Sequence, residues 1–533
     1  MITSFEIENF KAFKNRQRIP LKPITLIYGP NSAGKSSVIQ ALLYFQNLAE
    51  TKEADIDTIT IGDSNLNIRG FSNLINSQDI NKEMSFKTSF ISNKKNNIEL
   101  EFSLKKSDTE VIFTSIYISI DGENLISSKE RVIDINFNNI YITKICQNKL
   151  LENLYPPYKS YIENNFNIKL NEWLNRFNTY DFTKNRIYLN SDKLVIKFSD
   201  EKYIHDNNII HGSLRGEANL RNGYNKVFGS YSNFSRFLGI NNQIPDDVAA
   251  EMIKHHKDYE VPKLNQEIEI FKNKTNEEKD KIVLNYLFGK SLNIISDITN
   301  EVISTIKDKL HDVIHVPNFR KISQREDHSF KKYHYYDLLN SNKHRNFINS
   351  VIARKKLFTN RYSFEVKNWI VEDYGLNKSE IFIKDNVSNL LLNFEDLGTG
   401  VSQILPILMY VYGVNYHRIC IEQPELHLHP KLQSEISDFL IESALDRKFG
   451  NQFLIETHSE HLLLRIMKRI RQTTHGGLPD DIPPITPDDV AVLYVNPTEY
   501  EGSEILELRL DEDGEFIDPW PDGFFEEGYN DLF

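Results

Sequence analysis

The residues from Gly29 to Ser37, GPNSAGKSS, have the types and spacing of a loop that binds phosphate. Gly29 and Gly34 leave room for backbone N–H groups to wrap a triphosphate, because a side chain would block that approach. Lys35 is expected to reach the β- and γ-phosphates, and Ser36 is expected to hold Mg²⁺. The predicted nucleotide contacts are Gly29, Pro30, Asn31, Ser32, Ala33, Gly34, Lys35, Ser36 and Ser37.

Two distant segments each place a polar residue at the end of a short apolar strand. In RICIEQPELHLHP the apolar run Ile419–Ile421 leads into Glu422, whose carboxylate can meet the Mg²⁺ held by Ser36. In NQFLIETHSEHLLLRI a second strand is followed by His458 and an amphipathic helix. Because α/β sheets bind ligands at the carboxyl ends of their strands, His458 is predicted to lie beside the nucleotide.

A third segment, DLGTGVSQILPILMYVYG, breaks the chain at Gly398 and Gly400, before a buried helix that is predicted to begin at Val401. This layout suits a loop that presents backbone N–H groups and Ser402 to an anion at a helix N-terminus. A plain glycine turn before a core helix has the same pattern. The pair His427 and His429 has no further soft ligands nearby in the sequence, so a transition-metal site is not expected there.

The elements that must position these residues show in the sequence pattern. Residues 24–28 read as a short buried strand and the chain from Lys35 onward as a helix, so the loop joins a strand to a helix. Residues 97–106 and 110–123 alternate with period two, and the second run contains an Asp-Gly turn. Residues 146–310 differ: they are rich in Asn, Lys and Tyr and are predicted to be mainly helical.

Length and composition limit the class of protein. A chain of 533 residues predicts two to four domains. Cys146 and Cys420 are the only cysteines, which excludes a disulfide framework and favours a reducing compartment. The N-terminus lacks a secretory apolar segment, and no stretch approaches about 20 apolar residues. A cytoplasmic protein without a membrane span is therefore predicted.

The net charge of −12 is unevenly distributed. Residues 498–533 hold 13 acidic residues and one arginine, so this segment alone accounts for −12. Residues 320–367 hold 12 Lys and Arg against 4 acidic residues, with aromatic residues between them. Such a composition is typical of a nucleic-acid groove, but also of a solvated face or a dock for an acidic partner.

As a set, these motifs resemble the ABC-type ATPase heads shared by RecF, SMC and OLD-like proteins. They are more closely similar to the PtuA-type ATPases of Septu and retron-associated antiphage systems. The resemblance covers roughly residues 1–80 and 312–475, with the C-terminal WPDGFFEE. It implies an α/β fold: a P-loop sheet with an antiparallel β subdomain, split by a long, mainly helical insert.

The resemblance also assigns roles to the motifs. Residues 29–37 correspond to the Walker A loop, Glu422 to the Walker B acid and His458 to the switch histidine, with ATP and Mg²⁺ as cofactors. Gln78 corresponds to the Q-loop residue and is implied as a metal ligand with Ser36 and Glu422. The signature of one protomer is implied to close over the nucleotide of another, in a homodimer or higher oligomer. The signature residues are Gly398, Thr399, Gly400, Ser402 and Gln403.

The position that carries the catalytic glutamate in such ATPases is Gln423 in this chain. An amide can orient water but cannot accept its proton at neutral pH. Either Glu425 is the base, or hydrolysis is slow and ATP acts chiefly as a dimerising ligand. We predict slow turnover, with His458 contacting the γ-phosphate.

The resemblance implies an ATP-gated sensor and scaffold that controls a separate nuclease of the HNH type, PtuB-like, with a retron reverse transcriptase complex as a further possible partner. No nuclease domain is expected in this chain, because only 75 residues follow His458 and Asp511 and Asp513 read as a hairpin turn. The alternative is a stand-alone RecF- or SMC-like DNA-repair ATPase.

The predicted division of the chain has an N-terminal lobe, an inserted arm, a C-terminal lobe and an acidic end, at residues 1–145, 146–310, 311–475 and 476–533.

Overall fold

The computed structural model describes residues 2–135, 313–318 and 338–521, with short gaps, and a few short segments between 187 and 305. It divides into two compact units. The first comprises Met1–Asp134, Leu189–Val195 and Glu301–Phe533, and the second comprises Ile135–Tyr188 and Ile196–Asn300. The predicted helical arm at 146–310 lies almost wholly outside the described residues, and the basic segment at 320–367 is described only from Leu338 onward, with short gaps.

The phosphate loop belongs to a six-stranded sheet with the order β13-β17-β18-β3-β19-β20. The first five strands are parallel, and β20 pairs antiparallel with β19. Their bounds are β3 Ile24–Tyr28, β13 Val313–Val316, β17 Arg418–Glu422, β18 Gln452–Glu456, β19 Val490–Thr498 and β20 Gly502–Leu508. Every residue of β3 and β18 is buried, which explains why both strands read as continuous apolar runs.

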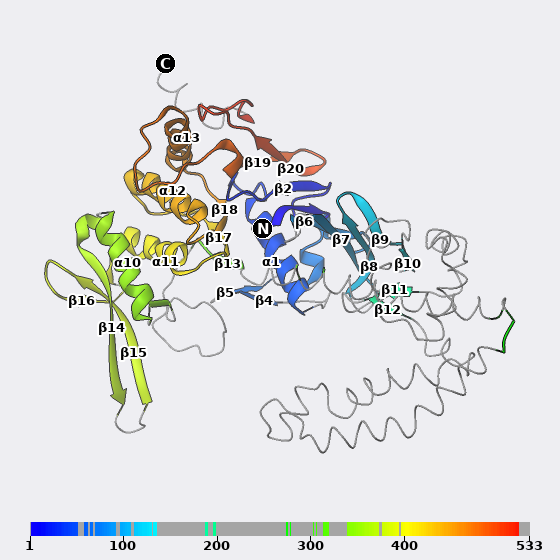
Figure 1. The fold of residues 1–533 in the computed structure, drawn as a ribbon, viewed down its shortest axis with the longest axis horizontal. Coiled ribbons are helices and arrows are strands. Elements are labelled where there is room, and N and C mark those ends of the chain that lie inside the picture. Colours follow the sequence, from blue (N-terminus) through cyan, green and yellow to red (C-terminus); the bar gives the residue numbers. More distant parts are fainter. Residues whose placement is uncertain are drawn as a thin grey trace. The chain divides into compact units, whose positions relative to one another are not determined.

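Four helices of the first unit share a hydrophobic core with this sheet (Figure 1). They are α10 Asn342–Arg354, α11 Thr399–Gly413, α12 Pro430–Leu445 and α13 Glu460–His475, while α1, Lys35–Thr51, follows the phosphate loop. Helix α11 begins at Thr399, two residues before the predicted start at Val401, because Gly398 has an extended conformation and is the N-cap. The rest of α11 is buried from Ile404 to Gly413, as its apolar sequence predicts.

An antiparallel sheet lies in the same unit, and its described order includes β9-β8-β7-β6-β1-β2. These strands are β1 Ile2–Glu8, β2 Gln17–Pro20, β6 Met84–Ile91, β7 Asn97–Lys106, β8 Val111–Ile120 and β9 Glu123–Lys129. The predicted strand at 97–106 is confirmed, and the predicted Asp-Gly turn follows β8. Aromatic rings fill the core under this sheet: Phe45 stacks on Phe102 with centroids 5.4 Å apart.

The structure has further strands besides these two groups. Strands β14 (Tyr362–Val371) and β15 (Leu376–Asp385) form a long hairpin that β16 (Leu391–Leu392) joins, in yellow-green in Figure 1. The remaining strands are β4 Thr58–Ile61, β5 Ser64–Asn67, β10 Val132–Ile135, β11 Ile187–Leu189 and β12 Ile196–Phe198. The fold class is confirmed as α/β, with a parallel sheet that carries the loop and a separate antiparallel sheet.

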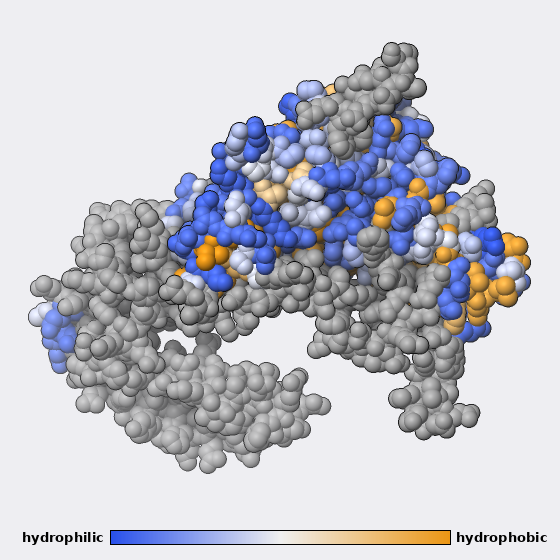
Figure 2. All heavy atoms as spheres, turned by 180° about the vertical axis from the view of Figure 1, so that it is seen from behind, coloured by the Kyte–Doolittle hydropathy of each residue, from blue (hydrophilic) through white to orange (hydrophobic). Residues whose placement is uncertain are grey.

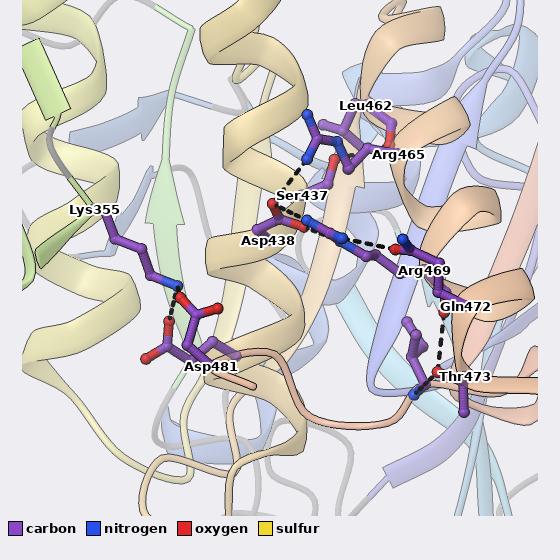
Figure 3. Close-up of polar contacts among 11 residues, drawn as sticks. Lys355, Ser437, Asp438, Leu462, Arg465, Arg469, Gln472, Thr473 and Asp481 are labelled. Atoms are coloured by element: carbon purple, nitrogen blue, oxygen red, sulfur yellow. Dashed lines mark hydrogen bonds and ion pairs between the residues drawn. The ribbon is translucent and has the colours of Figure 1, made fainter. Parts of the chain in front are cut away.

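A buried polar network joins α12 to α13 (Figure 3). Asp438 accepts hydrogen bonds from Arg469 Nε at 2.7 Å and from Arg465 Nη1 at 3.1 Å. The neighbouring Ser437 hydroxyl donates to the carbonyl of Leu462 at 2.8 Å. A paired charge in the interior tolerates little rearrangement, because removal of one partner leaves the other unpaired. The network therefore fixes α13, whose N-terminus carries the segment with His458.

The visible described surface is mainly hydrophilic, with separate hydrophobic patches (Figure 2). Among the described residues, no helix has both the length and the apolar character needed to cross a membrane.

Candidate functional site: a nucleotide cradle at the strand ends

The phosphate loop leaves β3 in a conformation that requires its glycines. Gly29 has φ +140° and Gly34 has φ +109°. A Cβ atom at Gly29 would lie 2.4 Å from the Val495 carbonyl oxygen, and one at Gly34 would lie 2.5 Å from the Cβ of Ala12. Neither position tolerates a side chain, so the loop keeps the open backbone that phosphate binding needs.

The hairpin formed by β19 and β20 contacts both the phosphate loop and the strand that leads into it. Strand β19 pairs with the whole of β3, from Val490 opposite Ile24 to Tyr494 opposite Tyr28. The Ser503 hydroxyl donates to the carbonyl of Ala33, within the loop. The sequence pattern did not reveal this support, because nothing in residues 490–508 marks them as partners of a strand more than 400 residues earlier.

Lys35 folds back into the loop and is almost fully buried, with 4% of its surface exposed. Its Nζ donates to the carbonyls of Gly29 at 3.0 Å and Pro30 at 2.9 Å. Burial lowers the pKa of Lys35, while the nearby carboxylates of Glu456 and Glu425 act in the opposite direction. The acceptors of the ammonium are thus neutral carbonyl groups of the loop. Phosphate oxygens can take their place, because charge-assisted hydrogen bonds are stronger.

Glu422 ends β17 at the carboxyl edge of the sheet, where the sequence places it. Its Oε1 lies 3.0 Å from His315 Nε2 on the neighbouring strand β13. His315 is a residue that the sequence analysis missed. About 100 residues separate β13 from β17 in the sequence, so only the pairing of the two strands shows that His315 lies next to Glu422.

Glu456 is a second residue that the sequence analysis missed, although its strand, QFLIE, ends in glutamate as the strand RICIE does. The Ser36 hydroxyl donates a hydrogen bond to its carboxylate. Burial raises the pKa of Glu456, as does Glu422, against the opposite effects of Ser36 and Lys35. Two glutamates therefore stand side by side at the strand ends, since Glu422 and Glu456 are register partners.

Glu425 holds the segment that contains the predicted switch histidine. Its Oε2 accepts from the Thr457 hydroxyl at 2.7 Å, and its Oε1 accepts from the backbone N–H of His458 at 2.7 Å. Burial, with a smaller effect of Lys35, lowers the pKa of His458 and so favours the neutral imidazole. Gln423 has φ +43°, and its backbone N–H donates to the carbonyl of Glu456 at 2.7 Å. The structure thus joins the loops after β17 and β18.

The predicted signature forms an accessible helix N-terminus. Gly398 and Thr399 are exposed, and the Ser402 hydroxyl donates to the Thr399 carbonyl at 2.9 Å. A Cβ at Gly400 would lie 3.1 Å from the His427 carbonyl oxygen, so the signature packs near the loop that follows Glu422. Gln403 is partly buried in the first turn of the helix.

Gln78 lies in a 3-10 turn, Asn76–Gln78, and is exposed with φ +56°. The preceding residues anchor this turn near the loop: the Asn76 side chain donates to the carbonyl of Lys11 at 2.7 Å. Within the described part of the chain, no hydrogen bond joins Gln78 to the loop through its side chain. Its role as a metal ligand remains a prediction.

The histidines of HLHP have structural contacts. His429 is the N-cap of α12, where its Nδ1 accepts from the Lys431 N–H at 3.3 Å, and His427 adopts φ +62°. No group of three or more His, Cys, Asp or Glu among the described residues is arranged to hold a metal ion. This does not bear on Mg²⁺ in a phosphate loop, which relies on phosphate oxygens and water for most of its ligands.

The residues present fit a nucleoside triphosphate with Mg²⁺. The glycine backbone leaves a space that a Cβ would fill, a buried ammonium lies at the loop mouth, and a buried carboxylate oxygen of Glu456 has no hydrogen-bond partner among the described residues. Together, the parallel sheet and the strand–loop–helix at its edge define a P-loop nucleotide-binding protein.

The comparisons with known proteins give the family. A model of the AAA ATPase domain family, AAA_15, matches residues 1–463, so the chain belongs to this family and is an ATPase of that kind. Residues 485–533 match a second family, described as a protein of unknown function, DUF3696. The SMC head domain from Thermotoga maritima is a similar solved structure, with a TM-score of 0.35 and 9% identity over 96% of this chain and 99% of that chain. No curated protein matches the sequence.

Proposed function

We propose that this chain binds ATP with Mg²⁺ at residues 29–37, hydrolyses it slowly, and uses the bound nucleotide to join two protomers. The observation that carries the proposal is the buried Lys35 ammonium, which donates to the loop carbonyls of Gly29 and Pro30 and interacts with the carboxylates of Glu456 and Glu425. Ser36 and Glu422 would hold Mg²⁺, and the metal would neutralise charge on the β- and γ-phosphates. His458, as a neutral imidazole, would donate a hydrogen bond to the γ-phosphate.

Dimerisation is supported by the exposed signature at the start of α11. Residues 398–403 offer a helix N-terminus and backbone N–H groups, which bind anions well. In the proposed dimer, this segment of one protomer contacts the triphosphate on the other. The site of one protomer would be complete only when a second protomer closes on it.

Slow turnover is supported by Gln423 and by the contacts of Glu425. Gln423 has no carboxylate, and both oxygens of Glu425 accept hydrogen bonds from the Thr457–His458 segment. Hydrogen bonds to the charged form stabilise it and weaken it as a base. The arrangement favours Glu425 as the residue that positions His458.

At the level of the cell, we propose a cytoplasmic sensor and scaffold that controls a partner nuclease in antiphage defence. The support is the resemblance of the motif set to PtuA-type ATPases. The alternative, a DNA-repair ATPase that binds DNA directly, is supported by the charge of residues 320–367. Co-purification with a nuclease encoded nearby would favour the first function. Salt-dependent DNA binding by the chain alone, lost on charge reversal in 320–367, would favour the second.

The test of the ATPase proposal measures nucleotide binding and mass together. A fluorescent ATP analogue should bind the full chain in Mg²⁺, and light scattering should show its mass double. Lys35→Ala should lose both effects, because the ammonium that contacts the phosphates is gone. Lys431→Ala, at a side chain that is 80% exposed, is the matched control and should bind and dimerise normally. A chain that binds the analogue but stays monomeric under all conditions would refute the dimer.

A further inference from the structure

Glu456 occupies the centre of the site, although the sequence motifs assign it no role. It ends β18, which lies between the phosphate-loop strand β3 and the Glu422 strand β17. In the strand register, Glu456 pairs with Glu422 on one side and with Ile27 on the other. The residue is 6% exposed, and the Ser36 hydroxyl donates to its carboxylate.

One oxygen of this carboxylate is left without a protein partner. Glu456 Oε2 is buried and has no hydrogen bond among the described residues. Burying such an atom costs folding free energy, because the atom loses its hydrogen bonds to water and gains no other partner. Buried carboxylate oxygens in this condition commonly mark a site for a bound cation or an ordered water.

The charges around Glu456 point to a cation. Lys35 is the ammonium of the loop, and both Glu456 and Glu425 act on it. Glu422 and Glu425 also act on Glu456, so three carboxylates and one ammonium lie in this part of the site. A divalent cation would balance this excess, and carboxylate and hydroxyl oxygens are the ligands that Mg²⁺ prefers.

We propose that Glu456 is a second carboxylate of the Mg²⁺ site and acts there with Ser36 and Glu422. The inference rests on the proposed function, since it assigns a further residue to the same nucleotide site. Its contact with the Ser36 hydroxyl places it beside the group that a phosphate loop offers to Mg²⁺. Gln78, by contrast, is exposed and comes from a surface turn. The sheet itself would thus supply the additional metal ligand.

The experiment measures metal binding directly. Mn²⁺ is titrated into the full chain with a non-hydrolysable ATP analogue, and free Mn²⁺ is followed by electron paramagnetic resonance. Glu456→Gln should weaken Mn²⁺ binding by about 10- to 100-fold. In EDTA the same variant should bind the analogue as well as the natural chain or better, because a negative charge near the phosphates has been removed. Glu460→Gln, an exposed glutamate nearby, is the matched control and should leave both affinities unchanged.

Two results would overturn the inference. One is Mn²⁺ affinity in Glu456→Gln within about twofold of the natural chain. The other is a variant that loses turnover but keeps its Mn²⁺ affinity, since Glu456 would then act on water and not on the metal. A natural chain that binds no nucleotide would instead refute the proposed function. If Glu456→Gln fails to fold, Glu456→Asp keeps the charge on a shorter side chain, and its Mn²⁺ affinity should fall while binding in EDTA persists.

Discussion

At the scale of single residues, the site combines a strong phosphate cradle with an unusual set of acids. Gln423 follows Glu422, and two further glutamates lie close to it: Glu425 in the same loop, and Glu456, whose backbone carbonyl accepts a hydrogen bond from the Gln423 N–H. Glu425 is occupied with the backbone of His458, and Glu456 contacts Ser36. The two glutamates therefore make different contacts, and the residue directly after Glu422 is an amide.

Gln423→Glu is expected to speed ATP turnover at least tenfold, because a carboxylate at this position can accept a proton from water. The positive φ of Gln423 is no greater burden for glutamate than for glutamine, so the loop should keep its conformation. Phosphate release under saturating Mg²⁺-ATP gives the rate, and Gln423→Glu combined with Lys35→Ala gives the background.

A different pair of results would identify Glu425 as the catalytic base. Should Gln423→Glu leave turnover unchanged while Glu425→Ala abolishes it, Glu425 is the base and the idea of a slow ATPase fails. Binding of the ATP analogue by Glu425→Ala must be measured in parallel, since loss of the contacts to Thr457 and His458 would also disturb the site.

At the scale of elements, local patterns predicted those parts of the molecule that depend on local sequence. The strand at 24–28, the helix from Lys35 and the alternating run at 97–106 are confirmed. Glycine and helix periodicity predicted α11, with a start two residues late. These features depend on backbone preferences and on which face of an element is buried, which neighbouring residues report.

Other features depend on which strands lie side by side, and a single sequence does not report strand order. Glu456 looked like the ordinary end of a buried strand until β18 was found between β3 and β17. His315 became part of the site in the same way, through the pairing of β13 with β17. Both are contacts made across the sheet between residues far apart in sequence.

The C-terminal segment contributes an aromatic contact to the element that carries the loop. Trp520 lies edge-on to Tyr28, at the end of β3, with ring centroids 5.6 Å apart. Tyr28 in turn donates a hydrogen bond from its hydroxyl to the carbonyl of Ser459, at 3.0 Å. Trp520 of the acidic C-terminal segment therefore packs on the strand that carries the phosphate loop.

Trp520→Ala is expected to destabilise the first unit by about 2 kcal/mol, through lost burial and lost ring contacts. A thermal melt should show a midpoint lower by several degrees, and the affinity for the ATP analogue should fall because Tyr28 borders the loop. Tyr500→Ala removes a ring that is 80% exposed and should change neither quantity. Equal melting of both variants and the natural chain would show that the tail does not support the loop.

At the scale of the whole molecule, the proposed dimer requires two incomplete half-sites. Gly398 suits a test, because its φ of −58° is ordinary and a Cβ there meets nothing within 4 Å. Gly398→Glu should therefore fold normally while placing a negative charge where the partner's phosphates are expected.

Lys35→Ala and Gly398→Glu should each abolish turnover when tested alone. When the two variants are mixed, part of the natural rate should return, because each mixed dimer has one site with both an intact loop and an intact signature. No recovery on mixing, with each variant shown to be folded by its melting curve, would place the signature in the same protomer as its nucleotide.

The pairing of β3 with β18 and β19 also sets when the loop can work. During synthesis the phosphate loop leaves the ribosome first, but both of its neighbouring strands begin beyond residue 450. At about 5 to 20 residues per second, roughly 20 to 90 s separate the loop from the strands that flank it. A nascent chain therefore has no formed nucleotide site until β18 and β19 have been made, and ATP can stabilise this protein only after that point.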